Sequence, residues 1–341
     1  MPIRFASIVV LSLLFMATQC LGQGSASGLF ETGVKLTEAK KFNEAAEAFS
    51  KAVQKDPNNG AAYRYLAWCQ GELGEHEAAA DSAKKAITLD PNDYVAYNNL
   101  GLELTMLGRF DDGITELKTA IKMNPSYALA HNNLANAYLH QGREDDALIE
   151  LKTAIGLDAK DIRPRSTLST LYIRTGKYRE AAAELEILTG MKPDSAAYFS
   201  SLGFAYMNFG EHQKAINALQ QAVTLDPKNT EDLQHLGTVQ VMAGKKEDAI
   251  ATFRQLLIQK PKDYESLMSL AIVLSATARY DEAIASGKEA LELRPTSERA
   301  VLLVAMTYID KRDKESARAY LPRLKDLDER LARILETALE R

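Results

Sequence analysis

The chain has few cysteines, little net charge and no run of basic residues, and each shortage excludes a class of protein. Two cysteines occur in 341 residues, and the formal net charge is -5 at pH 7. If Cys20 leaves with an N-terminal signal, Cys69 alone remains and no internal disulfide can form. Cys69 lies in an apolar segment, where a buried small hydrophobic residue is commoner than a reactive thiol. Nucleic acid is not expected as a partner.

Signatures of catalysis are also missing. The sequence contains no phosphate-binding loop, no dinucleotide-binding glycine pattern, no nucleophile elbow, no paired-histidine metal helix and no C-x-x-C motif. The five histidines are His76, His131, His140, His212 and His235. None of them has metal-ligand spacing with another. The sequence therefore predicts a protein that is not an enzyme, with no cofactor and no metal.

Residues 1–22 have the features of a secretory signal peptide. Arg4 precedes an apolar stretch from Phe5 to Met16, and Cys20-Leu21-Gly22 places small residues where signal peptidase reads. Cleavage before Gln23 would leave residues 23–28 as a flexible linker. Two alternatives stay open, namely a retained membrane anchor and a lipid on Cys20, although residues 17–19 match the lipidation motif poorly. We expect an exported protein, periplasmic or secreted, whose membrane association depends on such an anchor.

Prolines recur with a constant, 34-residue period. Seven of them share one phase, and Ala159 fills the only interior gap: Pro57, Pro91, Pro125, Pro193, Pro227, Pro261 and Pro295. With proline at position 32, repeat units begin at residues 26, 60, 94, 128, 162, 196, 230, 264 and 298. Positions 8 and 20 hold Gly, Ala or Ser in every unit. Small residues on both sides of a turn let two antiparallel helices approach closely.

The two helices of each unit have a predicted core and a predicted end. Leucine recurs at position 7 and leucine or phenylalanine at position 24, while proline stops the second helix. Pro322 falls inside the ninth second helix, where we expect a kink. Residues 326–341 are predicted to form a closing helix. The repeat array is predicted to span residues 26–331, so residues 332–341 are the end of this helix that lies beyond the array.

This pattern resembles the tetratricopeptide-repeat family, over a segment from Ala26 to about Leu331. The resemblance, to an exported bacterial type, implies an all-α solenoid of eight to nine antiparallel helix pairs in a right-handed superhelix with a C-terminal capping helix. First helices would line a concave groove. The first repeat departs from the pattern at Thr32 and Lys40, and the ninth repeat has Glu329 in place of proline. These departures mark the ends of the array.

The family geometry directs positions 2, 5, 6, 9, 12 and 13 of each unit towards the groove. The third and fourth repeats are rich in asparagine at these positions. Amide side chains carry both a donor and an acceptor for the backbone of an extended peptide. The alternative is that these side chains only solvate a surface or cap turns. Methionines on groove positions favour an adaptable binding surface, or else fill space between first helices. Met268 is assigned to the groove and Met123 to the core.

Trp68, the only tryptophan, lies beside Arg64 and Tyr65, and this combination is typical of binding hot spots. It could equally cover the thin N-terminal end of the array. Arg163 and Arg174 could receive an acidic side chain or a C-terminal carboxylate, or pair with nearby carboxylates. The predicted groove comprises Arg64, Trp68, Asn98, Asn99, Met106, Asn132, Asn133, Asn136, Arg163, Thr167, Arg174, Ser201, Phe204 and Met207.

Three functional hypotheses follow from these features. The leading one is a non-catalytic scaffold of the periplasm or cell envelope that binds a peptide segment or a helix of a partner protein in its groove. The second is a membrane-tethered spacer subunit of an envelope or secretion assembly. The third, an enzyme with an unrecognised site, would need a cleft with strongly perturbed titratable groups. The sequence identifies neither the partner nor the oligomeric state.

Overall fold

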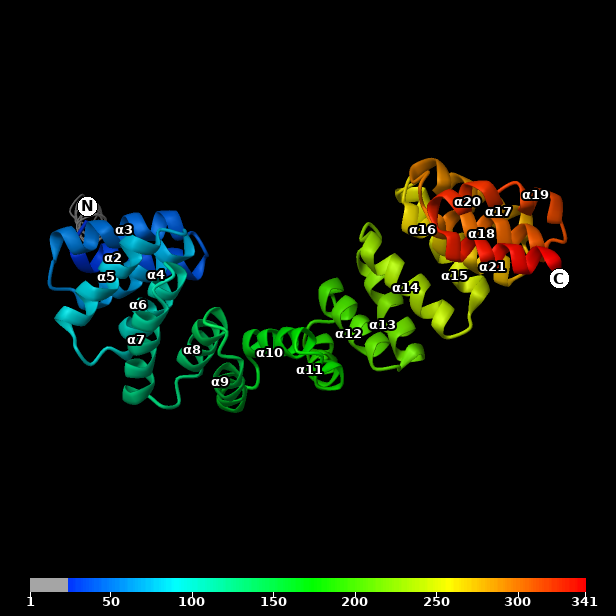
Figure 1. The fold of residues 1–341 in the computed structure, drawn as a ribbon. Helices are drawn as coiled ribbons and strands as arrows, with labels where there is room; N and C mark the ends of the chain where they lie inside the picture. The colour runs from blue at the N-terminus through cyan, green and yellow to red at the C-terminus, as the bar shows by residue number, and fades with distance from the viewer. Residues whose placement is uncertain (1–23) are drawn as a thin grey trace, which may run out of the picture. The chain divides into compact units, whose positions relative to one another are not determined.

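The computed structural model describes residues 24–341, which fold into helices joined by short turns and contain no strand (Figure 1). The predicted signal peptide lies outside the described residues. No helix within residues 24–341 combines the length and the apolar character needed to cross a membrane. Up to the ninth pair, each first helix has 13 residues and each second helix has 14 residues, as in α2 and α3.

The first helices start at the residues where the sequence repeats begin. They are α2 (Ala26–Glu38), α4 (Gly60–Glu72), α6 (Tyr94–Met106), α8 (Ala128–His140), α10 (Ile162–Arg174), α12 (Ala196–Asn208), α14 (Thr230–Met242), α16 (Tyr264–Ala276) and α18 (Glu298–Asp310). The second helices are α3 (Phe42–Lys55), α5 (His76–Leu89), α7 (Phe110–Met123), α9 (Glu144–Leu157), α11 (Tyr178–Met191), α13 (His212–Leu225), α15 (Lys246–Gln259) and α17 (Tyr280–Leu293). The predicted helix-pair architecture is confirmed.

The turns explain why the helices end where they do. Within six pairs the turn glycine has a positive φ between 72° and 90°, a conformation that glycine adopts without steric cost. Between pairs, the second helix stops two residues before its proline. Asp90, for example, has φ -135° and ψ 93° ahead of Pro91, because proline disfavours helical geometry in the preceding residue.

Small residues bring the two helices of a pair into close contact, as the sequence predicted. Gly101 of α6 faces Gly113 of α7, and a Cβ added at Gly101 would lie 2.8 Å from the Gly113 carbonyl oxygen and 2.6 Å from Leu117 Cγ. Real side chains do not tolerate such distances. The third pair therefore depends on the absence of a side chain at this crossing.

The chain divides into two compact units, with the boundary between Thr167 and Leu168. In the first unit, Phe49 is fully buried with Leu66 and Cys69 in the core formed by α2, α3 and α4. Burial raises the pKa of the Cys69 thiol, which hydrogen-bonds with Thr37. The prediction that Cys69 is buried is confirmed.

The second unit ends in three short helices, α19 (Lys314–Arg318), α20 (Leu321–Leu327) and α21 (Glu329–Glu340). The predicted kink at Pro322 is wrong, because the ninth second helix already stops at Arg318. Pro322 instead occupies the first turn of α20, where its missing N–H is tolerated. The closing helix likewise begins at Glu329 rather than Asp326, since Asp328 accepts backbone N–H groups of the new helix.

Helix α21 closes the second unit. Its buried residues Ala332, Leu335 and Leu339 join the core beneath α18 and α20. Without this helix, the apolar side of α18 and α20 would face water. Helix α21 thus performs the capping role that terminal elements of repeat proteins require.

Candidate functional site

Neighbouring first helices contact one another within each unit. Helices α2, α4, α6 and α8 do so in the first unit, and α12, α14, α16 and α18 do so in the second. Side chains at positions 2, 5, 6, 9, 12 and 13 of these helices are the predicted groove residues. We call the surface they define the first-helix face, and describe it separately for each unit.

The structure corrects the expectation that the asparagines all line an open surface. Asn98, Asn132 and Asn133 have only 1–5% of their surface exposed. Asn133 Nδ2 donates to Asn98 Oδ1 at 2.9 Å, linking α8 to α6. Short amide side chains at positions 5 and 6 lie in the seam between adjacent first helices, so they join these helices together. Asn99 and Asn136 are half-buried and remain closer to the surface.

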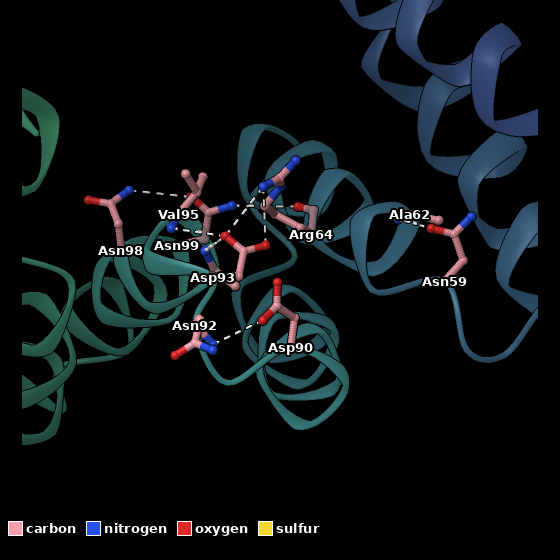
Figure 2. Close-up of polar contacts among 10 residues, drawn as sticks. Asn59, Ala62, Arg64, Asp90, Asn92, Asp93, Val95, Asn98 and Asn99 are labelled. Carbon is pink, nitrogen blue, oxygen red and sulfur yellow. Dashed lines mark hydrogen bonds and ion pairs between the residues drawn. The ribbon is translucent and has the colours of Figure 1, made fainter. Parts of the chain in front are cut away.

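Arg64 is held in a polar network between α4 and α6 (Figure 2). Its Nη1 donates to both carboxylate oxygens of Asp93 at 3.1 and 3.3 Å. Asp93 also caps α6 by accepting the backbone N–H groups of Val95 and Ala96. Asn99 Nδ2 donates to the Arg64 carbonyl oxygen at 3.5 Å. The positive charge of Arg64 is therefore offset by Asp93 and is not a free anchor for an acidic ligand.

Trp68 lies on the exposed side of an aromatic cluster. Its ring meets Phe42 edge-on, with a centroid distance of 6.1 Å, and Tyr65 at 6.3 Å. The indole Nε1 donates to Glu72 Oε1 at 3.2 Å. These contacts fix the ring while 42% of its surface stays exposed. A rigid, half-covered tryptophan matches the form of a binding anchor.

Two carboxylates near Trp68 were not predicted as site residues. Glu72 is exposed, and no ion pair to it is found within residues 24–341. Glu103 is buried, with Oε2 at 2.7 Å from His76 Nδ1. Burial raises the pKa of Glu103, the hydrogen bond with His76 opposes this, and the charge of Glu72 raises it further. Gly71 leaves room for the Glu103 carboxylate, since an added Cβ would lie 2.2 Å from Oε1.

The remaining predicted residues of the first unit differ in accessibility. Met106 is exposed, whereas Thr167 is half-buried at the end of the unit. Arg163 donates through Nη2 to Asp161 Oδ2 at 2.7 Å and through Nε to the same carboxylate. This pairing lowers the pKa of Asp161. Arg163 therefore fits the alternative of a local ion pair better than that of a carboxylate receptor.

In the second unit, Phe204 repeats the arrangement found at Trp68. Both residues occupy position 9, and each is met edge-on by an aromatic ring at position 17 of the preceding pair. The Tyr178–Phe204 centroid distance is 6.0 Å. Phe204 and its neighbours Ser201 and Met207 are half-buried, while Arg174 is exposed.

The apolar part of the second unit's first-helix face extends beyond the predicted residues. Val241, Met242 and Ile272 are exposed large hydrophobic residues at positions 12, 13 and 9. Val241 and Ile272 were missed, although their positions would have identified them. Met268 is buried in the core and Met123 is exposed, so both of these predicted placements are wrong. No group of histidine, cysteine and acidic residues in the described part of the chain has an arrangement that could hold a metal ion.

Comparisons with known proteins agree with the fold. Sequence profiles of the tetratricopeptide repeat match residues 36–101, 99–162, 167–230, 207–271 and 265–294. A comparison with curated proteins gives no match. The crystal structure of YrrB, described as a TPR protein with an unusual peptide-binding site, is 20% identical, with a TM-score of 0.50. The alignment covers 54% of this chain and 95% of YrrB.

Two further structures align less closely. A tetratricopeptide repeat protein from Parabacteroides merdae is 17% identical with a TM-score of 0.47, covering 73% of this chain and 98% of that protein. The structure "MamA MSR-1 C2" is 26% identical with a TM-score of 0.45, and the alignment covers 50% of this chain and 99% of that protein. The profile matches span most of the described residues. The chain therefore belongs to the tetratricopeptide-repeat family, whose arrays serve as scaffolds for protein–protein interactions.

Proposed function

We propose that this chain is an exported, non-catalytic scaffold that binds a peptide segment or a helix of a partner protein on its first-helix face. The observation that carries the proposal is Trp68, which is fixed by Phe42, Tyr65 and Glu72 yet exposed over 42% of its surface. The exposed part of the Trp68 ring is apolar surface in contact with water. A partner that covers it gains binding free energy from removing that surface from water. Met106 adds a second exposed apolar side chain from the neighbouring helix α6.

We expect Trp68→Ala to weaken capture of the partner from a native envelope extract by about tenfold or more, because hot-spot aromatics dominate interface energies. Ile149→Ala is the matched control, since Ile149 is also an exposed apolar residue but belongs to the second helix α9. Circular dichroism should show the same helical content for both variants. Equal capture by Trp68→Ala and the unaltered chain would contradict the proposal.

The state of the mature N-terminus separates the proposed scaffold from the alternative of a membrane-tethered spacer. The proposal rests on the charge, apolar stretch and small residues of the signal-like segment. Intact mass measurement of the protein from its native cell is expected to give a chain beginning at Gln23. A mass that includes residues 1–22, or a lipid on Cys20, would favour the tether instead.

A further inference from the structure

We infer that the part of the first-helix face around Trp68 takes a cationic side chain, arginine or lysine, from an extended segment of the partner. The inference rests on the proposed function and specifies the chemistry of its ligand. It is drawn from three features of the first unit, namely the exposed indole, the unpaired carboxylate beside it and the neutralised arginine next to it.

The indole is prepared to receive a cation. Phe42 and Tyr65 contact the Trp68 ring from α3 and α4, and Glu72 accepts its N–H, so the ring does not need to be ordered on binding. Tryptophan gives the strongest cation–π attraction among aromatic side chains. Within residues 24–341, the cation–π pairs found involve tyrosine or phenylalanine and leave the Trp68 ring without a cation.

The local charge on this surface is negative. Glu72 accepts a hydrogen bond from Trp68 but has no cationic partner among the described ion pairs. Arg64, the cation of α4, is already paired with Asp93 and lies 5.5 Å from the Tyr65 ring centroid. The first-helix face of α2 adds the exposed Glu31 and Glu38, with Lys35 as the basic residue of the last turn.

Glu72 also lies close to two buried titratable groups. Burial is the main cause of the raised pKa of Cys69 and of Glu103 on the neighbouring helix α6, and the charge of Glu72 adds a smaller contribution to both. Because Glu72 is exposed and has no cationic partner among the described ion pairs, it attracts a positive group from a ligand.

Because Trp68 is the only tryptophan, its fluorescence reports on this site alone in the full chain. The probes are the acetylated, amidated peptides Ala-Leu-Arg-Leu-Ala and Ala-Leu-Cit-Leu-Ala, in which neutral citrulline replaces arginine with the same shape. We expect the arginine peptide to shift the emission and to bind about tenfold more tightly than the citrulline peptide. The difference should shrink as NaCl is raised.

Two variants locate the charge. Glu72→Gln keeps an oxygen that accepts the indole N–H, so it should preserve the ring position and its cation–π attraction while clearly reducing the preference for arginine. Glu77→Gln removes another exposed carboxylate, from the second helix α5, and should leave the preference intact. Equal affinity for the two peptides would overturn the inference. If both peptides nevertheless shifted the emission, Trp68 would still be a binding surface and the proposed scaffold role would stand. No emission change with either peptide at millimolar concentration would overturn the site at Trp68.

Discussion

Gly101→Val is expected to lower the free energy of unfolding by about 3 kcal/mol, at the upper end of the usual cost of overpacking a core. The reason is that an added side chain would collide with Leu117 Cγ and with the Gly113 carbonyl oxygen of α7, and this backbone oxygen cannot rotate away as a flexible side chain can. Helices α6 and α7 must then separate. Urea denaturation followed by circular dichroism measures the loss, and hydrogen exchange should place the weakened protection in α6 and α7.

Gly156→Ala provides the contrast at another helical glycine. Apart from its two chain neighbours and the backbone of α9, no atom lies within 4 Å of a Cβ added at Gly156, which is exposed. Alanine favours the helix over glycine, so we expect this variant to gain about 0.5–1 kcal/mol. If both variants changed stability by the same amount and in the same direction, close approach at position 8 would not be the reason for its small residues.

Leu335→Asp is expected to cost about 4 kcal/mol or more, because it removes a fully buried leucine and places a charge in an apolar core. The damage should begin in α18, α20 and α21, since α21 packs on the other two helices. Hydrogen exchange should show these helices losing protection before α2 to α9.

The neighbouring residue supplies the control for this second prediction. Ile334 lies on the same helix but is 47% exposed, so Ile334→Asp should change stability by less than about 0.5 kcal/mol. Both variants introduce one aspartate into α21 at adjacent positions. The two variant chains therefore have the same net charge and the same aspartate in the helix, and they differ mainly in the burial of the replaced side chain. A similar loss in both variants would mean that α21 does not act as a packed cap.

The helix pairs could be predicted from the sequence because the repeat constrains them residue by residue. Turn glycines such as Gly108 have positive φ, and small residues such as Gly101 occupy crossings where a side chain would collide. Each of these requirements is local or lies within one pair. The period of the prolines therefore carried enough information to identify the start of every first helix.

The candidate site was less predictable, since exposure depends on how neighbouring pairs pack. Asn98 and Asn133 occupy expected groove positions, but they hydrogen-bond to each other in the seam between α6 and α8. Met268 has the same position number as Asn98, yet it is buried in the core of the second unit. Position in the repeat indicates a direction from the helix axis, whereas burial also depends on the size of the surrounding side chains.

Side-chain pairing limited the prediction in a second way. Arg64 and Arg163 were chosen as possible anchors for a partner, and both are engaged by aspartates, Asp93 and Asp161. Each of these aspartates directly precedes a first helix, α6 or α10, at the same position of its repeat. The aspartate directly before each of these helices was visible in the sequence, since N-cap positions favour aspartate.

The even spacing of the first helices also has a mechanical consequence. Each pair is held mainly by the contact between its own two helices and by the helices next to it. Under tension, a pair that gives way releases one repeat, which is roughly 115 Å of extended chain at about 3.4 Å per residue. The folded protein is therefore expected to extend under force in steps of nearly equal length, as pairs unfold one after another, rather than in a single unfolding event.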